Sequence, residues 1–180
     1  AAVRVVEAEV AAAREGAHEA AEAARAEAAA EKKKELRARA ELQQRDLTTG
    51  LVTGEIDLSE YADEDGLPEA SSLAVIGDTL YVALQRLDRN AGWEPESGVI
   101  AAIDCQSSTV SSHWSTGPNP VIQDVVDGRL LISTGVYGEL DGEVFLLHTA
   151  GEVEPSVLFS EAELGSDITH AALVSDQLLL

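Results

Sequence analysis

The sequence contains an internal repeat, and this feature constrains the fold more than any other. Three stretches align at a shared turn position, which Gly77, Asp127 and Ser175 occupy at spacings of 50 and 48 residues. They read VIGDTLYVAL (75–84), VVDGRLLISTG (125–135) and LVSDQLLL (173–180). A second element, GVIAAIDCQSSTV (98–110) and GEVFLLHTAGEV (142–153), repeats between them. Such self-similarity predicts a tandem series of equivalent supersecondary units.

Each unit is predicted to be a pair of β-hairpins, that is, a set of four short antiparallel strands. Runs of β-branched residues, separated by Asp-Gly and similar turn pairs, support this assignment. The predicted strands are 73–76, 80–84, 99–103 and 109–114 in one unit, and 121–126, 129–133, 143–147 and 153–159 in the next. Residues 45–59 have the pattern of the closing half of an earlier unit. Four strands that recur every ~40–50 residues are typical of β-propeller blades.

The sequence also resembles the YVTN-type propeller repeat of bacterial surface and secreted proteins. A Gly-x-x-Pro entry (117–120) precedes the first strand of a unit, and an Asp-Gly turn (127–128) follows that strand. YVAL (81–84) and LIST (131–134) stand at the tetrapeptide of that family, and Ile-Asp (103–104) ends the next strand. The resemblance implies a secreted, cell-surface or periplasmic location. It implies no single activity, because such propellers include binding proteins, surface-layer proteins and enzymes.

The number of units decides whether a ring can close. Residues 46–180 hold two full units, the last strands of a preceding one and the first strands of a following one. A closed ring requires at least about four blades. We therefore expect a mainly β fold, a partial propeller of about two full four-stranded blades with unpaired edges.

Residues 1–45 have a different character and predict one long α-helix. They are rich in Ala, Glu, Arg and Lys and contain no Pro and no turn pair. Val3, Val6 and Val10 begin an apolar stripe, but Ala continues it until Leu36. A stripe of Ala buries little surface, so we interpret this segment as an exposed stalk or spacer. A partner-binding coiled coil is an alternative, and so is a segment that is not the natural neighbour of the repeats.

The charge of the chain limits its partners. Residues 1–45 hold equal numbers of acidic and basic side chains, so the formal net charge of −21 belongs to the remaining sequence. Such a charge repels nucleic acid and anionic membranes, and the chain has no apolar run of transmembrane length. It suits a cationic ligand, Ca²⁺ or solubility alone. Cys105 is the only cysteine, so no internal disulfide can form.

The longer connections between strands are expected to share one end of the sheets. Successive connections of an up-and-down sheet alternate between its two ends, and long connections are where binding residues usually lie. The connections at this end are 57–71, 85–97, 115–120, 134–141 and 159–169, and they carry most of the acidic residues that follow residue 45. The candidate ligand-binding residues there are Asp88, Trp93, Tyr137 and Asp141. An exposed Trp beside charges suits a sugar or a peptide, whereas a Trp that folds back over the sheet is structural.

One of these connections, SEYADEDGLPEAS (59–71), has the spacing of a calcium loop. Asp63, Asp65 and Glu69 fall at positions 3, 5 and 9 of a D-x-D-x-D-G loop, with Gly66 at the sharp turn. Tyr61 occupies the first ligand position, where the loop requires Asp. The stretch predicts either a calcium site that lacks one ligand or an acidic turn with Gly66 at a positive φ angle.

No motif for catalysis is present. The chain has no G-x-S-x-G, no phosphate-binding glycine loop, no C-x-x-C and no H-E-x-x-H, so no catalytic residue is predicted. Our leading hypothesis is a non-catalytic binding or structural module of a bacterial surface or secreted propeller protein. Its acidic loop face would bind a peptide, a glycan or a cation, with calcium the one cofactor considered. The alternative is a fragment of a propeller enzyme, lactonase-like or lyase-like, whose site other blades complete.

Overall fold

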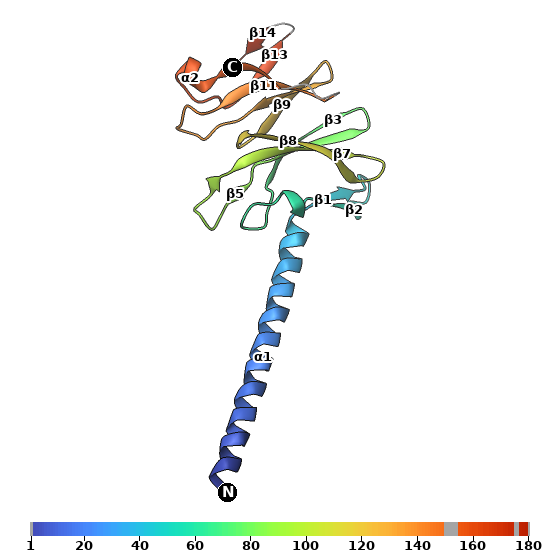
Figure 1. The fold of residues 1–180 in the computed structure, drawn as a ribbon. Coiled ribbons are helices and arrows are strands. Elements are labelled where there is room, and N and C mark those ends of the chain that lie inside the picture. Colours follow the sequence, from blue (N-terminus) through green and yellow to red (C-terminus); the bar gives the residue numbers. More distant parts are fainter. Residues whose placement is uncertain (1, 150–154, 175–176, 180) are drawn as a thin grey trace. The chain divides into compact units, whose positions relative to one another are not determined.

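The computed structural model describes residues 2–149, 155–174 and 177–179, which Figure 1 shows as a ribbon. The chain divides into two compact units, Ala1–Arg39 and Ala40–Leu180. The first unit is the helix α1 (Ala2–Arg39). Its described side chains, at positions 15–32, 34 and 35, are all exposed, as a helix without a broad apolar face predicts.

The helix ends earlier than the sequence predicts. Residues 41–45, expected to be helical, form the strand β1 (Glu41–Arg45), which pairs antiparallel with β2 (Val52–Asp57). Leu42 of β1 packs into an apolar cluster with Ile56 and Leu58. This burial and the strand pairing override the helix propensity of Glu, Leu, Gln and Arg, so the helical prediction for residues 41–45 is corrected.

The second unit contains two four-stranded antiparallel sheets in which the strands follow chain order, and we call them the first and second meander. The first meander consists of β3 (Ala70–Ile76), β4 (Thr79–Leu84), β7 (Ser97–Asp104) and β8 (Thr109–Pro118). The second consists of β9 (Val121–Val126), β10 (Arg129–Ser133), β11 (Glu143–His148) and β12 (Ser156–Ser160). Both sets of strands were predicted from the sequence, although residues 153 and 154 of the last one lie outside the described residues.

Two-stranded hairpins flank the meanders. β1–β2 precedes the first, and β13 (Ala172–Val174) with β14 (Gln177–Leu179) follows the second. A small ribbon of β5 (Leu87–Asp88) and β6 (Glu94–Pro95) lies in the connection from β4 to β7, and the short helix α2 (Glu161–Leu164) follows β12. The described strands form separate antiparallel sheets and do not close into a barrel.

The repeat seen in the sequence is visible in the turns. Asp127 and Gly128, between β9 and β10, have φ angles of 50° and 71°, as a two-residue primed turn requires. Gly77 has a φ of 59° at the equivalent turn between β3 and β4. Ser175, the third predicted turn residue, lies outside the described residues.

A second repeated turn relates β1–β2 to β7–β8. The Asp46 Oδ1 atom accepts hydrogen bonds from the backbone N–H groups of Thr48 and Thr49 and from the Thr49 hydroxyl. Asp104 Oδ1 accepts the same set from Gln106 and Ser107. These bonds lower the pKa of both carboxyl groups. The β1–β2 turn thus has the same local geometry as the turn between β7 and β8.

Apolar side chains cover both faces of each meander. One cluster lies between the two meanders and contains Tyr81 and Ile100 from the first and Leu130 and Phe145 from the second. The opposite face of the first meander packs against β1–β2 through Ile56 and Leu58. That of the second packs against the segment of β13 through Ala171 and Leu173. The order is therefore hairpin, meander, meander and hairpin (Figure 1).

Gly98→Ala is expected to lower the free energy of unfolding by about 1–3 kcal/mol, the usual cost of overpacking. A Cβ atom at this position would overlap the ring of Pro120, which is fully buried directly before β9. Gly54→Ala in β2 is the control, because its nearest neighbour would be the movable end of the Gln44 side chain. Chemical denaturation measures both losses, and equal losses would contradict this account of Gly98.

Candidate ligand-binding site

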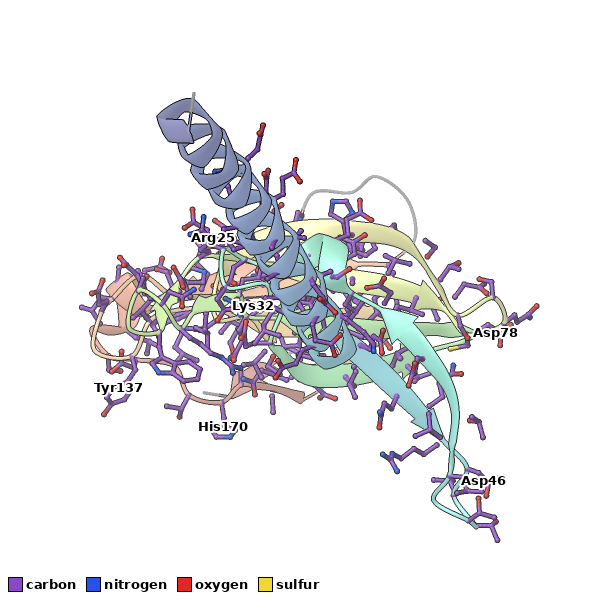
Figure 2. All side chains as sticks on the ribbon, turned by 90° about the horizontal axis from the view of Figure 1, so that it is seen from below. Arg25, Lys32, Asp46, Asp78, Tyr137 and His170 are labelled. Atoms are coloured by element: carbon purple, nitrogen blue, oxygen red, sulfur yellow. The ribbon has the colours of Figure 1, made fainter. Side chains whose placement is uncertain are left out.

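The longer connections of the two meanders lie together at one end, which we call the loop end. It comprises the connections 58–69, 85–96, 119–120, 134–142 and 161–171. Figure 2 shows Tyr137, in one of these connections, on the opposite side of the sheets from Asp78, in the β3–β4 turn. This separation follows from the antiparallel order of the strands, because successive connections alternate between the ends.

A small cavity of about 170 Å³ opens at the loop end. Its walls come from the end of β4, the β8–β9 and β10–β11 connections and the segment between α2 and β13. The side chains that give it chemical character carry amide, hydroxyl, phenol and carboxylate groups, and include Gln85, Asn119, Ser133, Tyr137, Asp167 and Thr169. The cavity is therefore built by segments that are distant in the sequence.

Some of these groups hold the walls in place, and others are available to a ligand. The Asn119 side chain donates to the Gly135 carbonyl, and Asp167 accepts a hydrogen bond from the Gly138 N–H. In the part of the chain that the structure describes, the side chains of Gln85, Tyr137 and Thr169 make no hydrogen bond. The cavity thus offers free amide, phenol and hydroxyl groups to a ligand, and hydrogen bonds hold the connections that carry its walls in place.

Glu161 connects two of the segments that line the cavity, and it was not among the residues predicted from the sequence. It is the first residue of α2 and is only 2% exposed. Its Oε2 atom accepts from the Gly142 N–H at 2.8 Å, and its Oε1 atom accepts from the Ile168 N–H at 2.7 Å. Glu161 therefore joins two of the connections that line the cavity. Ser160 and Glu163 form a capping box at the start of α2, and this Ser-x-x-Glu pattern is readable in the sequence.

Of the four predicted ligand-binding residues, Tyr137 borders the cavity, and Asp141 lies in the same β10–β11 connection without lining it. The Tyr137 side chain is 86% exposed and borders the cavity. Asp141 closes the same connection, because its Oδ1 atom accepts from the Val136 N–H at 2.8 Å. Asp141 therefore positions the loop that carries Tyr137.

Asp88 and Trp93 lie elsewhere, in the β5–β6 ribbon. The Trp93 N–H donates to the Asp88 carbonyl, and the Arg89 guanidinium carbon lies 4.8 Å from the centroid of the Trp93 ring. Trp93 remains 56% exposed. Within the described residues, no hydrogen bond, ion pair or ring contact connects this ribbon to the loop of Tyr137. The predicted face is thus divided between two places.

Two of the three predicted calcium ligands, Asp65 and Glu69, lie beside a cation that the protein itself supplies. Arg89 donates its backbone N–H to Asp65 Oδ2 at 3.2 Å, and its Nε atom lies 3.7 Å from the same oxygen. Its Nη2 atom lies 3.1 Å from Glu69 Oε1, as an ion pair without hydrogen-bond alignment. Asp63 accepts the Asp65 N–H, and Gly66 has the expected positive φ of 85°. A guanidinium therefore occupies the neighbourhood of two of the carboxylates.

The structure adds no further support for calcium at this place. Among the described residues, no group of three or more His, Cys, Asp or Glu side chains is arranged to hold a metal ion. The calcium site stays a prediction. Burial raises the pKa of both Asp63 and Glu69, and Asp63 Oδ2 is buried without a hydrogen-bond partner.

Comparisons with known proteins do not assign the chain to a family. No protein-family model matches it, and no curated protein matches it. No helix in the part of the chain that the structure describes is both long enough and apolar enough to cross a membrane. The function is therefore inferred from the residues and their geometry.

Asp63→Asn is expected to raise the melting temperature at pH 7. Burial raises the pKa of Asp63 in the folded state, so folding disfavours its charged form, and a neutral amide removes that cost. The gain should shrink as the pH falls through the raised pKa, because the wild-type carboxyl group then becomes neutral as well. Thermal unfolding between pH 7 and pH 4 measures the effect.

Asp104→Asn is the matched control, and its expected change in melting temperature has the opposite sign. The hydrogen bonds from Ser107 lower the pKa of Asp104, so its carboxylate contributes stability that is present above its ordinary value of 3.8 and is lost as the pH falls through the lowered one. This variant should melt below the wild type at pH 7. If Asp63→Asn also melts lower in Ca²⁺ and a chelator abolishes the difference, a bound cation requires the Asp63 charge.

Arg89→Ala is expected to lower the free energy of unfolding by about 1–3 kcal/mol, more than the loss of an exposed ion pair. The substitution leaves the Asp65 and Glu69 side chains, which are 6% and 10% exposed, without their cation. Arg129→Ala is the control, because its partner Asp127 is 86% exposed. Equal losses in urea denaturation would show that Arg89 does not organise the two loops.

Proposed function

We propose that residues 40–180 form a segment of a β-propeller and that its loop end binds a glycan without catalysing a reaction. The stacking of two complete meanders between two hairpins supports the first part, because propeller blades are four-stranded antiparallel sheets that repeat in this way. The primed Asp127-Gly128 turn and the buried Pro120 support the resemblance to the YVTN-type repeat. A secreted or cell-surface location accompanies this proposal.

The observation that carries glycan binding is the exposed Tyr137 ring at the edge of a cavity whose lining includes hydrogen-bonding side chains. The apolar faces of a pyranose ring pack on aromatic rings, and its hydroxyl groups require amide, hydroxyl and carboxylate partners. Tyr137 supplies such a ring, while Gln85 and Thr169 supply hydrogen-bonding groups that are free of internal partners. The volume of about 170 Å³ lies below the ~300–1,000 Å³ of pockets for drug-sized ligands, so it suits a single sugar unit.

The charges at the site favour a neutral or amine-bearing sugar. Glu161 and Asp167 line the cavity, no Lys or Arg does, and the chain has a formal net charge of −21. Sulfated and uronic acid sugars would therefore be repelled. Both oxygens of Glu161 already accept backbone N–H groups, which supports a positioning role for this carboxylate and not proton transfer to a substrate.

Tyr137→Ala is expected to weaken glycan binding at least about tenfold, because it removes the ring on which the sugar would stack. Tyr137→Phe should retain most of the affinity, since the ring remains. Trp93→Ala is the matched control, an exposed aromatic residue that does not border the cavity. A glycan array with neutral and acidic sugars, followed by titration calorimetry on the best ligand, measures these effects. Binding that is lost with Trp93 and kept without Tyr137, or binding of acidic sugars alone, would contradict the proposal.

A further inference from the structure

A second cavity, of about 250 Å³, opens beside the one that Tyr137 borders. It lies along the segment that runs from the end of α2 toward β13, and its lining includes Leu164, Ser166 and His170. Residues 167–169 line both cavities, and we call them the shared wall. The two cavities therefore adjoin each other at the loop end.

Each cavity has a ring of its own at its border. Tyr137 lines only the first cavity, and His170 lines only the second. Figure 2 shows both side chains projecting from the same side of the second unit. Neither cavity alone reaches the ~300 Å³ at which pockets for drug-sized ligands begin, whereas the two together exceed it. A ligand that passes over the shared wall can thus contact both rings.

The shared wall and the second cavity keep polar groups free for such a ligand. Asp167 uses its Oδ1 atom to accept the Gly138 N–H at 2.8 Å, and its Oδ2 atom accepts no hydrogen bond from the described residues. The side chains of Ser166, Thr169 and His170 make no hydrogen bond within the same part of the chain. A carboxylate oxygen and a hydroxyl group therefore lie on the wall between the two rings.

The second cavity also has an apolar part, which the first lacks beside its ring. Leu164 is 40% exposed and lines only the second cavity, and Ile168 of the shared wall packs against the apolar cluster of the second meander. An acetamido group has the two matching features. Its N–H is a donor for a carboxylate such as that of Asp167, and its methyl group gains free energy by leaving water beside an aliphatic side chain.

We infer that the loop end binds a glycan of at least two linked units, with an N-acetylated amino sugar in the second cavity and the adjoining unit against Tyr137. The acetamido N–H then donates to Asp167, its methyl group packs against Leu164, and the glycosidic bond passes over the shared wall. An N-acetylated sugar is neutral, so the acidic groups of the site do not repel it. The inference rests on the proposed function, because it extends the same site.

A comparison of matched sugars on the complete chain tests the inference. A glycan array first compares N-acetylated disaccharides of different linkages with their non-acetylated counterparts and their component monosaccharides. The 1,4-linked dimer of N-acetylglucosamine, cellobiose and N-acetylglucosamine form one such set. Titration calorimetry then measures the best set. The N-acetylated disaccharide should bind at least about tenfold more tightly than either component monosaccharide, and its non-acetylated counterpart should lose most of this gain.

Leu164→Gln tests the apolar contact separately. It should bring the N-acetylated disaccharide to within about threefold of its non-acetylated counterpart, because the methyl group would lose its aliphatic neighbour. Leu47→Gln is the matched control, since Leu47 is fully exposed in the β1–β2 turn and lines neither cavity. An unchanged preference for the N-acetylated sugar in folded Leu164→Gln would overturn the assignment of the second cavity.

The outcomes separate this inference from the proposed function. Equal affinity for the disaccharide and its tighter component would overturn the inference and leave glycan binding at Tyr137 standing. Equal affinity for the acetylated and the non-acetylated disaccharide would also overturn it. Failure of every sugar to bind would overturn both. If circular dichroism shows that Leu164→Gln does not fold, the comparison of sugars on the wild type decides alone.

Discussion

The structure depends on the burial of sheets on both of their faces. In β4 and β7 the residues from Tyr81 to Leu84 and from Gly98 to Ile103 are all buried, so neither face of these strands is open to water there. Covering a Val, Leu or Ile side chain fully contributes roughly 1.5–3 kcal/mol, and each face of a meander offers several of them. Each sheet therefore requires a neighbouring sheet on both sides. A tandem series meets this requirement by repetition, which explains why the sequence repeats.

The same stacking places the candidate site. Because neighbouring strands of each meander are antiparallel, every second connection reaches the loop end, where segments from both meanders converge. Glu161 then fixes the β10–β11 connection to the segment after α2 by two hydrogen bonds to backbone N–H groups. Ser71 and Ser72 hold β3 against the start of β9 in a comparable way. The cavity thus forms where the end of β4 meets the connections of the second meander, and neither meander could form it alone.

Features that a few adjacent residues determine were predictable from the sequence. The Asp127-Gly128 turn has the backbone that its residues favour, and the runs of β-branched residues between turn pairs located the strands of both meanders. Features that depend on distant partners were not. Glu41–Arg45 has helix-forming residues but forms a strand because β2 is available for pairing. The place of Arg89 between Asp65 and Glu69 depends on the folding of two separate connections onto each other.

The three basic side chains beyond residue 45 show how the acidic face is balanced. Arg129 pairs with an exposed aspartate in a turn, whereas Arg86 and Arg89 both lie in the connection from β4 to β7. Arg86 contacts Glu96 at 2.8 Å and donates to the Ser97 carbonyl, and Arg89 faces the acidic connection before β3. Arg86 and Arg89 therefore stabilise the long connections before β3 and between β4 and β7 through these contacts. The cavity beside Tyr137 has no such cation among its lining residues, so a ligand there meets only neutral and acidic groups. The loop end therefore has two parts. In the connections around Arg86 and Arg89, acidic groups are paired with arginines of the same chain, whereas the cavity beside Tyr137 has polar groups available to a ligand.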